Sequence, residues 1–85
     1  MVEKISINIK VPSLNVEHNF LVPIDMSVGV TVGLIEKTLL EEYPGVKKSL
    51  LNTKALMQLS TGKILALACN LRQLGIIQGE KLLLL

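Results

Sequence analysis

Residues 27–43 read SVGVTVGLIEKTLLEEY and form the only long stretch of the chain with a helical pattern. Apolar side chains recur there every three or four positions, at Val28, Val32, Ile35, Leu39 and Tyr43. This spacing puts them on one face of a helix. Ser27 is suited to cap the start, because its hydroxyl accepts from free N–H groups of the first turn. Pro44-Gly45 then ends the helix, since proline disfavours a helical residue before it.

Two strands are predicted before this helix. Residues 4–11, KISINIKV, alternate strictly, with Ile5, Ile7, Ile9 and Val11 on one face. Such alternation indicates a half-buried strand. Turn-forming residues follow at 12–15, and a second strand is expected over 16–24, which makes an antiparallel hairpin. His18, Phe20 and Val22 share a face of the second strand, and we expect that face to point inward.

The segment after the helix predicts three more strands. Residues 54–60 (KALMQLS) form the third, a tight turn lies at 60–63, and residues 64–68 form the fourth. Residues 70–74 are expected to form a 3₁₀ or single helical turn. The final strand, 80–85, carries leucines on both faces, so we place it in the middle of the sheet beside the first strand. Earlier, an irregular segment with Val46, Leu50 and Leu51 is expected to cover one end of the core.

These elements predict an α+β fold for one domain spanning residues 1–85. The order is hairpin, helix, two short strands, a small turn and a final strand. A mixed five-strand sheet curled around one main helix is the β-grasp arrangement. Nearly half of the 85 residues are apolar, which is typical of a folded globule.

Composition excludes several partners. The net charge is +2, and the only basic cluster is Lys47, Lys48 and Lys54, which we interpret as solvated charges. Phe20 and Tyr43 are the only aromatic residues, so the chain offers no stacking platform for nucleic acid. The longest apolar run, 64–69, is far shorter than a membrane span. With no signal-peptide pattern and a single cysteine, we expect a cytoplasmic protein without direct membrane insertion.

No pattern indicates an enzyme. His18, the only histidine, has no cysteine, histidine or acid at ligand spacing, so we expect a partly buried residue at the core edge. Cys69 lacks a nearby histidine and is expected to be a small buried hydrophobic residue. Gly29 and Gly33 lie inside the helical pattern, where they cannot cradle a phosphate. We predict no catalytic residue, no metal and no cofactor.

An ordered set of short segments resembles a known family. Residues 71–82 follow the pattern L-x-x-L-G-I-x-x-G-x-x-L, which looks like the C-terminal half of ubiquitin-like domains. Residues 20–23 (FLVP), 28–39, 61–65 (TGKIL) and 79–82 (GEKL) extend the likeness over about 4–85. The chain most resembles the YukD/EsaB-type ubiquitin-like proteins of type VII (WXG100) secretion in Gram-positive bacteria. It departs from that family in the apolar Leu83 and in its low aromatic content.

The resemblance also bears on the chemistry of the chain. Ubiquitin and sulfur carriers react through a flexible tail that ends in Gly-Gly, where glycine fits a narrow adenylating site. This sequence ends at Leu85, inside its expected last strand. We therefore expect a protein that is not conjugated. A sulfur-carrier or modifier-type protein with a missing tail stays open as an alternative.

The remaining expectation is a protein-binding surface on the open face of the sheet. If Leu82 and Leu84 face the helix, as the resemblance implies, then Leu83 and Leu85 face outward. Met57 or Leu59 on the neighbouring strand would join them in an exposed apolar patch, a feature that often marks an interaction site. Leu21 and Leu34 are weaker candidates for a second surface. Reversed strand parity, or a homodimer covering the patch, would be the alternatives.

Together these expectations describe a non-catalytic, ubiquitin-like adaptor. It would be a cytoplasmic accessory of a type VII secretion system and bind a component of the secretion machinery. A homodimeric regulatory domain is a further alternative.

Overall fold

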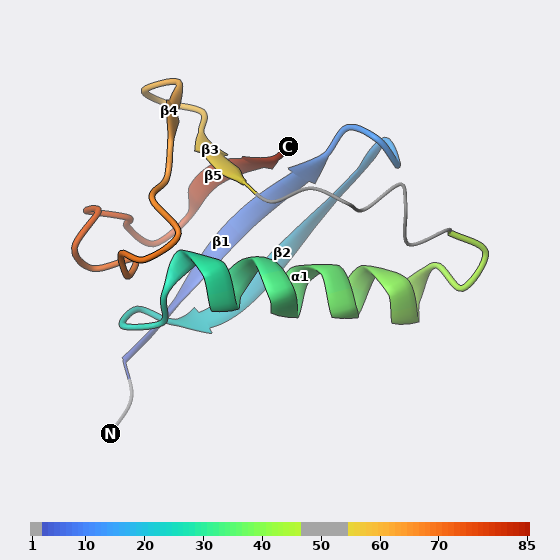
Figure 1. The fold of residues 1–85 in the computed structure, drawn as a ribbon, viewed down its shortest axis with the longest axis horizontal. Coiled ribbons are helices and arrows are strands. Elements are labelled where there is room, and N and C mark those ends of the chain that lie inside the picture. The colour runs from blue at the N-terminus through green and yellow to red at the C-terminus, as the bar shows by residue number, and fades with distance from the viewer. Residues whose placement is uncertain (1–2, 47–54) are drawn as a thin grey trace.

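The computed structural model describes residues 3–46 and 55–85. Within them lie one helix and five strands: β1 (Lys4–Val11), β2 (Val16–Pro23), α1 (Val28–Glu42), β3 (Leu56–Gln58), β4 (Lys63–Ile64) and β5 (Glu80–Leu84). The strands form one sheet in the order β2-β1-β5-β3-β4. β5 runs parallel to β1, and the other neighbours are antiparallel. Helix α1 crosses one face of this sheet (Figure 1). The predicted β-grasp and the central place of the last strand are confirmed.

The β1–β2 hairpin follows its sequence pattern closely. Ile5, Ile7, Ile9 and Val11 are all buried, as the alternation predicts. The register sets Ile7 opposite Phe20 and Val11 opposite Val16. Asn15 closes the turn at φ 53°, a left-handed conformation that asparagine tolerates better than most residues. β2 ends at Pro23, one residue earlier than predicted, and Ile24 N–H still donates to Glu3 C=O at 2.9 Å.

Helix α1 starts where its cap predicts. Ser27 Oγ accepts from Val30 N–H at 3.2 Å. The first N–H groups of a helix have no partner within it, and here a later segment supplies acceptors. Val28 N–H donates to Cys69 C=O at 2.9 Å, and Gly29 N–H donates to Leu67 C=O at 3.0 Å. The predicted apolar face is buried from Val28 to Leu39, and Tyr43 is the C-cap.

Those two acceptors explain why the predicted fourth strand, 64–68, is wrong. β4 covers only Lys63–Ile64. After Leu65, whose N–H still donates to Leu56 C=O at 2.8 Å, the chain leaves the sheet and passes over the start of α1. There its carbonyls bond to the helix rather than to a strand. Cys69 belongs to this segment and is only partly buried, whereas the sequence predicts a small buried residue.

The third strand is shorter than the predicted 54–60. β3 covers Leu56–Gln58, and the turn toward β4 already begins at Leu59, where Gly62 N–H donates to Gln58 C=O at 2.8 Å. β5 ends at Leu84. Lys47, Lys48, Leu50, Leu51 and Lys54 lie outside the described residues. Val46 is partly buried and packs against the core.

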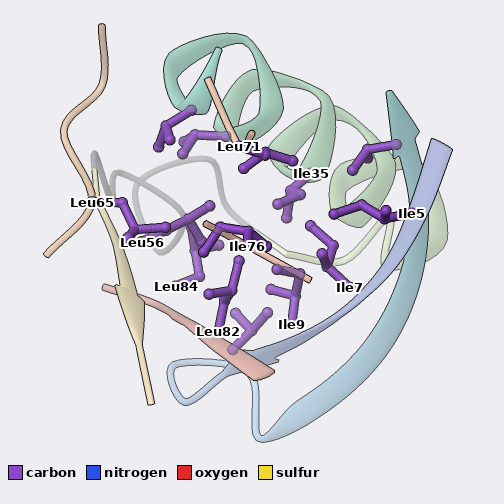
Figure 2. Close-up of a cluster of buried hydrophobic side chains, with 14 of the residues drawn as sticks. Ile5, Ile7, Ile9, Ile35, Leu56, Leu65, Leu71, Ile76, Leu82 and Leu84 are labelled. Carbon is purple, nitrogen blue, oxygen red and sulfur yellow. The ribbon is translucent and has the colours of Figure 1, made fainter. Parts of the chain in front are cut away.

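The core fills the space between α1 and the inner face of the sheet. Figure 2 shows Ile7 and Ile9 of β1 and Leu82 and Leu84 of β5 pointing toward Ile35 of α1. Leu71 and Ile76 close the layer from the segment before β5 and are 0% and 2% exposed. Fully burying one such aliphatic side chain contributes about 1.5–3 kcal/mol. This layer is the main reason for the fold.

Two sets of hydrogen bonds fix the position of the segment before β5. Asn70 and Gln73 bond reciprocally: Gln73 N–H donates to Asn70 Oδ1 at 2.8 Å, and Asn70 N–H donates to Gln73 Oε1 at 2.9 Å. This sets the compact turn predicted at 70–74. Gly79, at φ 81°, then donates its N–H to Ser6 C=O at 2.7 Å. A positive φ is readily adopted only by glycine, so Gly79 guides the chain into β5.

Candidate protein-binding surface

The final strand divides its leucines between the two faces of the sheet. Leu82 and Leu84 are 0% and 2% exposed and face α1. Alternation along a strand therefore turns Leu83 to the outer face. Leu83 is half-buried there, and Leu85, just after the strand, is 42% exposed. This is the parity that the family resemblance implies for residues 82–85.

The neighbouring strand completes this outer surface. Met57 pairs directly with Leu83, and Leu56 pairs with the inward Leu84, so Met57 faces outward. Leu59 is 37% exposed, and its N–H donates to Lys81 C=O at 3.1 Å. Both Met57 and Leu59 thus lie beside β5. We call Met57, Leu59, Leu83 and Leu85 the outer patch.

Ile64 extends the outer patch and was not predicted as part of it. It pairs with Met57 across β3 and β4 and is 56% exposed. Its neighbour Leu65 is buried, 4% exposed, as expected when adjacent positions in an extended segment face opposite sides. The third and fourth strands are so short that their patterns alone do not fix this parity.

A shallow depression borders the outer patch at the hairpin end of the sheet. It has a volume of about 300 Å³, and Leu83 forms one wall. Lys10 lies between Leu83 on β5 and Glu17 on β2. An apolar surface edged by charges is the usual anatomy of a modest protein interface. The remaining lining residues are Val11, Pro12, Asn15 and Val16.

The two weaker candidates lie elsewhere. Leu21 is 67% exposed on the outer face of β2, opposite Ser6 of β1. β1 separates it from the outer patch, since β1 lies between β2 and β5. Leu34 is 44% exposed and lies on α1, which covers the other face of the sheet. The structure therefore brings the four residues of the outer patch together and leaves Leu21 and Leu34 apart from them.

His18 is a partly buried residue at the core edge, as predicted. Its Nε2 lies 2.6 Å from the Tyr43 hydroxyl, and its ring meets Phe20 and Tyr43 edge to face. These contacts join β2 to the end of α1 and give His18 a structural role. Across residues 3–46 and 55–85, no three His, Cys, Asp or Glu side chains gather in a way that could hold a metal ion.

An exposed charge cluster ties three segments together at another point of the molecule. Arg72 donates to Glu3 at 2.6 Å and to Asp25 at 2.8 Å. The hydrogen bond from Arg72 holds the pKa of Asp25 below its ordinary value of 3.8. The hydrogen bonds that Arg72 donates, above all the one to Asp25 and next the one to Glu3, raise the pKa of Arg72. The cluster links the start of β1, the β2–α1 loop and the turn after residue 70.

Comparison with solved structures identifies the fold. A ubiquitin-like domain of an Arabidopsis thaliana protein matches with a TM-score of 0.73 and 20% identity, covering 99% of this chain and 78% of that one. The EccD5 ubiquitin-like domain from Mycobacterium xenopi matches with a TM-score of 0.74 and 16% identity, covering 98% and 93%. The ubiquitin-like domain of the Mycobacterium tuberculosis type VII secretion system protein ECCD1 matches with a TM-score of 0.72 and 13% identity, covering 98% of each chain.

The fold is therefore the ubiquitin-like β-grasp. No family model matches the chain, and no curated protein matches it either. The solved structures resemble it in fold, and two of them are EccD domains. No helix in the described part of the chain is long and apolar enough to cross a membrane.

Proposed function

We propose that residues 1–85 act as one ubiquitin-like, non-catalytic adaptor that binds a protein partner through the outer patch. The observation that carries this proposal is the outward pairing of Met57 with Leu83, flanked by the exposed Leu59, Leu85 and Ile64. In the described residues these apolar side chains face away from the core. Exposed apolar groups that adjoin one another favour association, because binding removes their surface from water.

The partner class follows from the chemistry of the patch and from the fold. A patch of aliphatic side chains and methionine, bordered by Lys10 and Glu17, suits an apolar protein surface with a polar rim. The fold likeness to two EccD domains, one of them from a type VII secretion system, supports a component of such machinery as the partner. The proposal is thus a cytoplasmic accessory of type VII secretion, of the YukD/EsaB type.

A pull-down from cytoplasm and detergent-solubilised membrane of the native host tests this function. The bait is compared with its Leu83→Asp/Leu85→Asp variant, and circular dichroism checks that both are folded. The expected result is a secretion-machinery component recovered by the wild type and lost with the folded variant. The control is Leu67→Asp/Ile77→Asp, because Leu67 and Ile77 are 47% and 66% exposed but lie outside the strands.

The control separates patch-specific binding from general stickiness. A partner that is lost equally with both double variants would contradict the proposal. So would recovery of the same component by the folded Leu83→Asp/Leu85→Asp variant. Unfolding of this variant alone would show that the two leucines are needed by the core, and the outer patch would then not be a free surface.

A further inference from the structure

The two edges of the sheet are very different. β4 forms one edge and has only two residues, Lys63–Ile64. β2 forms the other edge and has eight residues, Val16–Pro23. Its pairing with β1 is one to one along the whole strand, so no bulge interrupts it. Proteins usually protect a long edge with lysine, proline or a bulge. β2 contains no lysine, and its only proline is its last residue.

The register shows which backbone groups of β2 face this open edge. Ile24 N–H donates to Glu3 C=O, so the odd residues of β1 bond to β2. The other side of β1 is consistent with this assignment. Gly79 N–H donates to Ser6 C=O, so the even residues of β1 bond toward β5. On β2, the even residues are therefore paired with β1. Glu17, Asn19 and Leu21 direct their N–H and C=O groups away from it.

No backbone group in residues 3–46 or 55–85 bonds to this row. Leu21 in the same row is 67% exposed, more than any other large apolar residue described. An extended row of free donors and acceptors next to an exposed leucine is a template for another strand. The edge is thus built to pair.

We propose that the occupant is a second copy of this chain, paired antiparallel through β2 with the two-fold axis at Phe20. In an antiparallel pair, each residue of the open row must lie opposite an odd-numbered residue of the partner's strand, so that N–H and C=O groups face each other. The axis can then lie at His18, Asn19 or Phe20. Side-chain chemistry distinguishes these three registers.

An axis at His18 makes the two Glu17 side chains diagonal neighbours, and like charges so close are unfavourable. An axis at Asn19 sets Leu21 directly opposite the partner's Glu17. An axis at Phe20 sets Phe20 opposite the partner's Phe20 on the inner face, and makes the two Leu21 side chains diagonal neighbours on the outer face. Aromatic and aliphatic contacts of this kind stabilise paired strands.

Charge complementarity also favours the axis at Phe20. In that register the partner's Glu17 lies opposite Pro23, which has no N–H, so this end pair keeps only the bond from the partner's Glu17 N–H to Pro23 C=O and the pairing depends mainly on Asn19 and Leu21. Lys4 of β1 pairs with Pro23 from the other side and is exposed. Lys4 and the partner's Glu17 therefore lie on the outer face with only the short proline ring between them. Their long side chains can meet above it, and the two-fold axis repeats this contact.

The product is one continuous sheet with an outer patch toward each end. β1 and β5 separate β2 from β3, so self-pairing leaves Met57 and Leu83 uncovered. The dimer would present two outer patches to a partner, although its formation does not depend on that partner. Self-pairing and partner binding can therefore be tested independently.

Sedimentation of the full chain from micromolar to millimolar concentration tests the association. Leu21→Pro removes an N–H that points away from β1, so the hairpin keeps its own bonds. We expect a concentration-dependent dimer that this variant weakens by about tenfold or more, since each copy loses a backbone bond. Leu21→Lys should act in the same direction. Ile77→Lys is the matched control, because Ile77 is 66% exposed, and it should leave the dimer unchanged.

Cysteine cross-linking in a Cys69→Ser background tests the register. Phe20→Cys should form a disulfide-linked dimer, because facing residues at the axis approach within disulfide range. His18→Cys and Asn19→Cys report the other two registers and should cross-link poorly, with circular dichroism confirming that each variant is folded. A dominant cross-link through position 18 or 19 would overturn the register.

Three other results would overturn self-pairing itself. The first is a wild-type chain that stays monomeric at millimolar concentration. The second is a dimer that persists undiminished in both Leu21 variants. The third is a monomer whose Glu17, Asn19 and Leu21 amides become protected from hydrogen exchange only when an extended peptide is added, which would assign the edge to a peptide ligand.

Discussion

Leucine occupies both faces of the sheet at β5, but its surroundings differ between the two faces. Leu82 and Leu84 lie against α1 and are 0% and 2% exposed, whereas Leu85 on the opposite side is 42% exposed. Leu83 stands between these extremes, half-buried beside Met57. In a strand, facing alternates with each residue. Position parity, rather than hydrophobicity, therefore decides which leucines are buried in the core and which are exposed on the outer face.

The largest effect is expected from the inner face. Leu82→Ala removes a side chain that is completely buried between β5 and the core. Such a truncation loses the transfer free energy and leaves a cavity, so the free energy of unfolding should fall by about 2–5 kcal/mol. Urea denaturation followed by circular dichroism measures this change. A loss below about 1 kcal/mol would contradict the core role of Leu82, because Leu82 would then contribute no more than a surface residue.

A smaller effect on stability is expected from the outer face. Leu85→Asp changes a side chain that follows the end of β5, and the free energy of unfolding should move by no more than about 0.5 kcal/mol. Leu85 N–H donates to Ala55 C=O at 3.0 Å, and this backbone bond survives the substitution. The same urea series checks the value. A loss as large as that of Leu82→Ala would show that both faces are core.

The smallest effect on stability is expected at the exposed charge cluster of Arg72, Glu3 and Asp25. Arg72→Gln removes the exposed ion pairs with Glu3 and Asp25, and such pairs contribute little in water. Arg72 lies next to Leu71, which is 0% exposed, so this variant contrasts a surface contact with its buried neighbour. Thermal unfolding at neutral pH should show only a slight decrease in Tm.

The pH dependence of that decrease has a definite sign. The pKa of Asp25 is lower in the folded chain than its ordinary value of 3.8. Its stabilising contribution is therefore present above the ordinary value and is lost as the pH falls through the lowered pKa. The difference in Tm between wild type and Arg72→Gln should accordingly shrink in acid. A difference that grows as the pH falls would contradict the role given to this pair.

Strict periodicity explains what the sequence predicted well. The alternation of 4–11 matches the buried set of β1. The spacing of 27–43 predicts the buried Val28, Val32, Ile35 and Leu39 of α1, but it omits the buried Thr31 and includes the C-cap Tyr43. Leucines on both faces of residues 80–85 predict a central strand, and β5 is central in the sheet. Each of these patterns is long enough for one secondary structure and one orientation to satisfy it.

The sequence predictions are wrong where backbone groups form hydrogen bonds with a segment far away in the sequence instead of with a neighbouring strand. Residues 65–69 carry a strand-like apolar run, yet Leu67 and Cys69 give their carbonyls to the start of α1. The local sequence pattern does not indicate that these carbonyls are acceptors for the first N–H groups of α1. The sequence does not predict the outward position of Ile64, because β4 is too short to show alternation. The unpaired backbone groups of Glu17, Asn19 and Leu21 on β2 follow from the hydrogen-bond register with β1. Composition does not determine that register.

The measurement that tests the division of β5 most directly is a paired one on two variants, Leu82→Ala and Leu83→Asp/Leu85→Asp. For each, the free energy of unfolding is measured together with the amount of partner retained per folded molecule. We expect the first variant to lose stability and keep the partner, and the second to keep its fold and lose the partner. If both variants lose stability and partner in parallel, the two faces of β5 do not have separate roles.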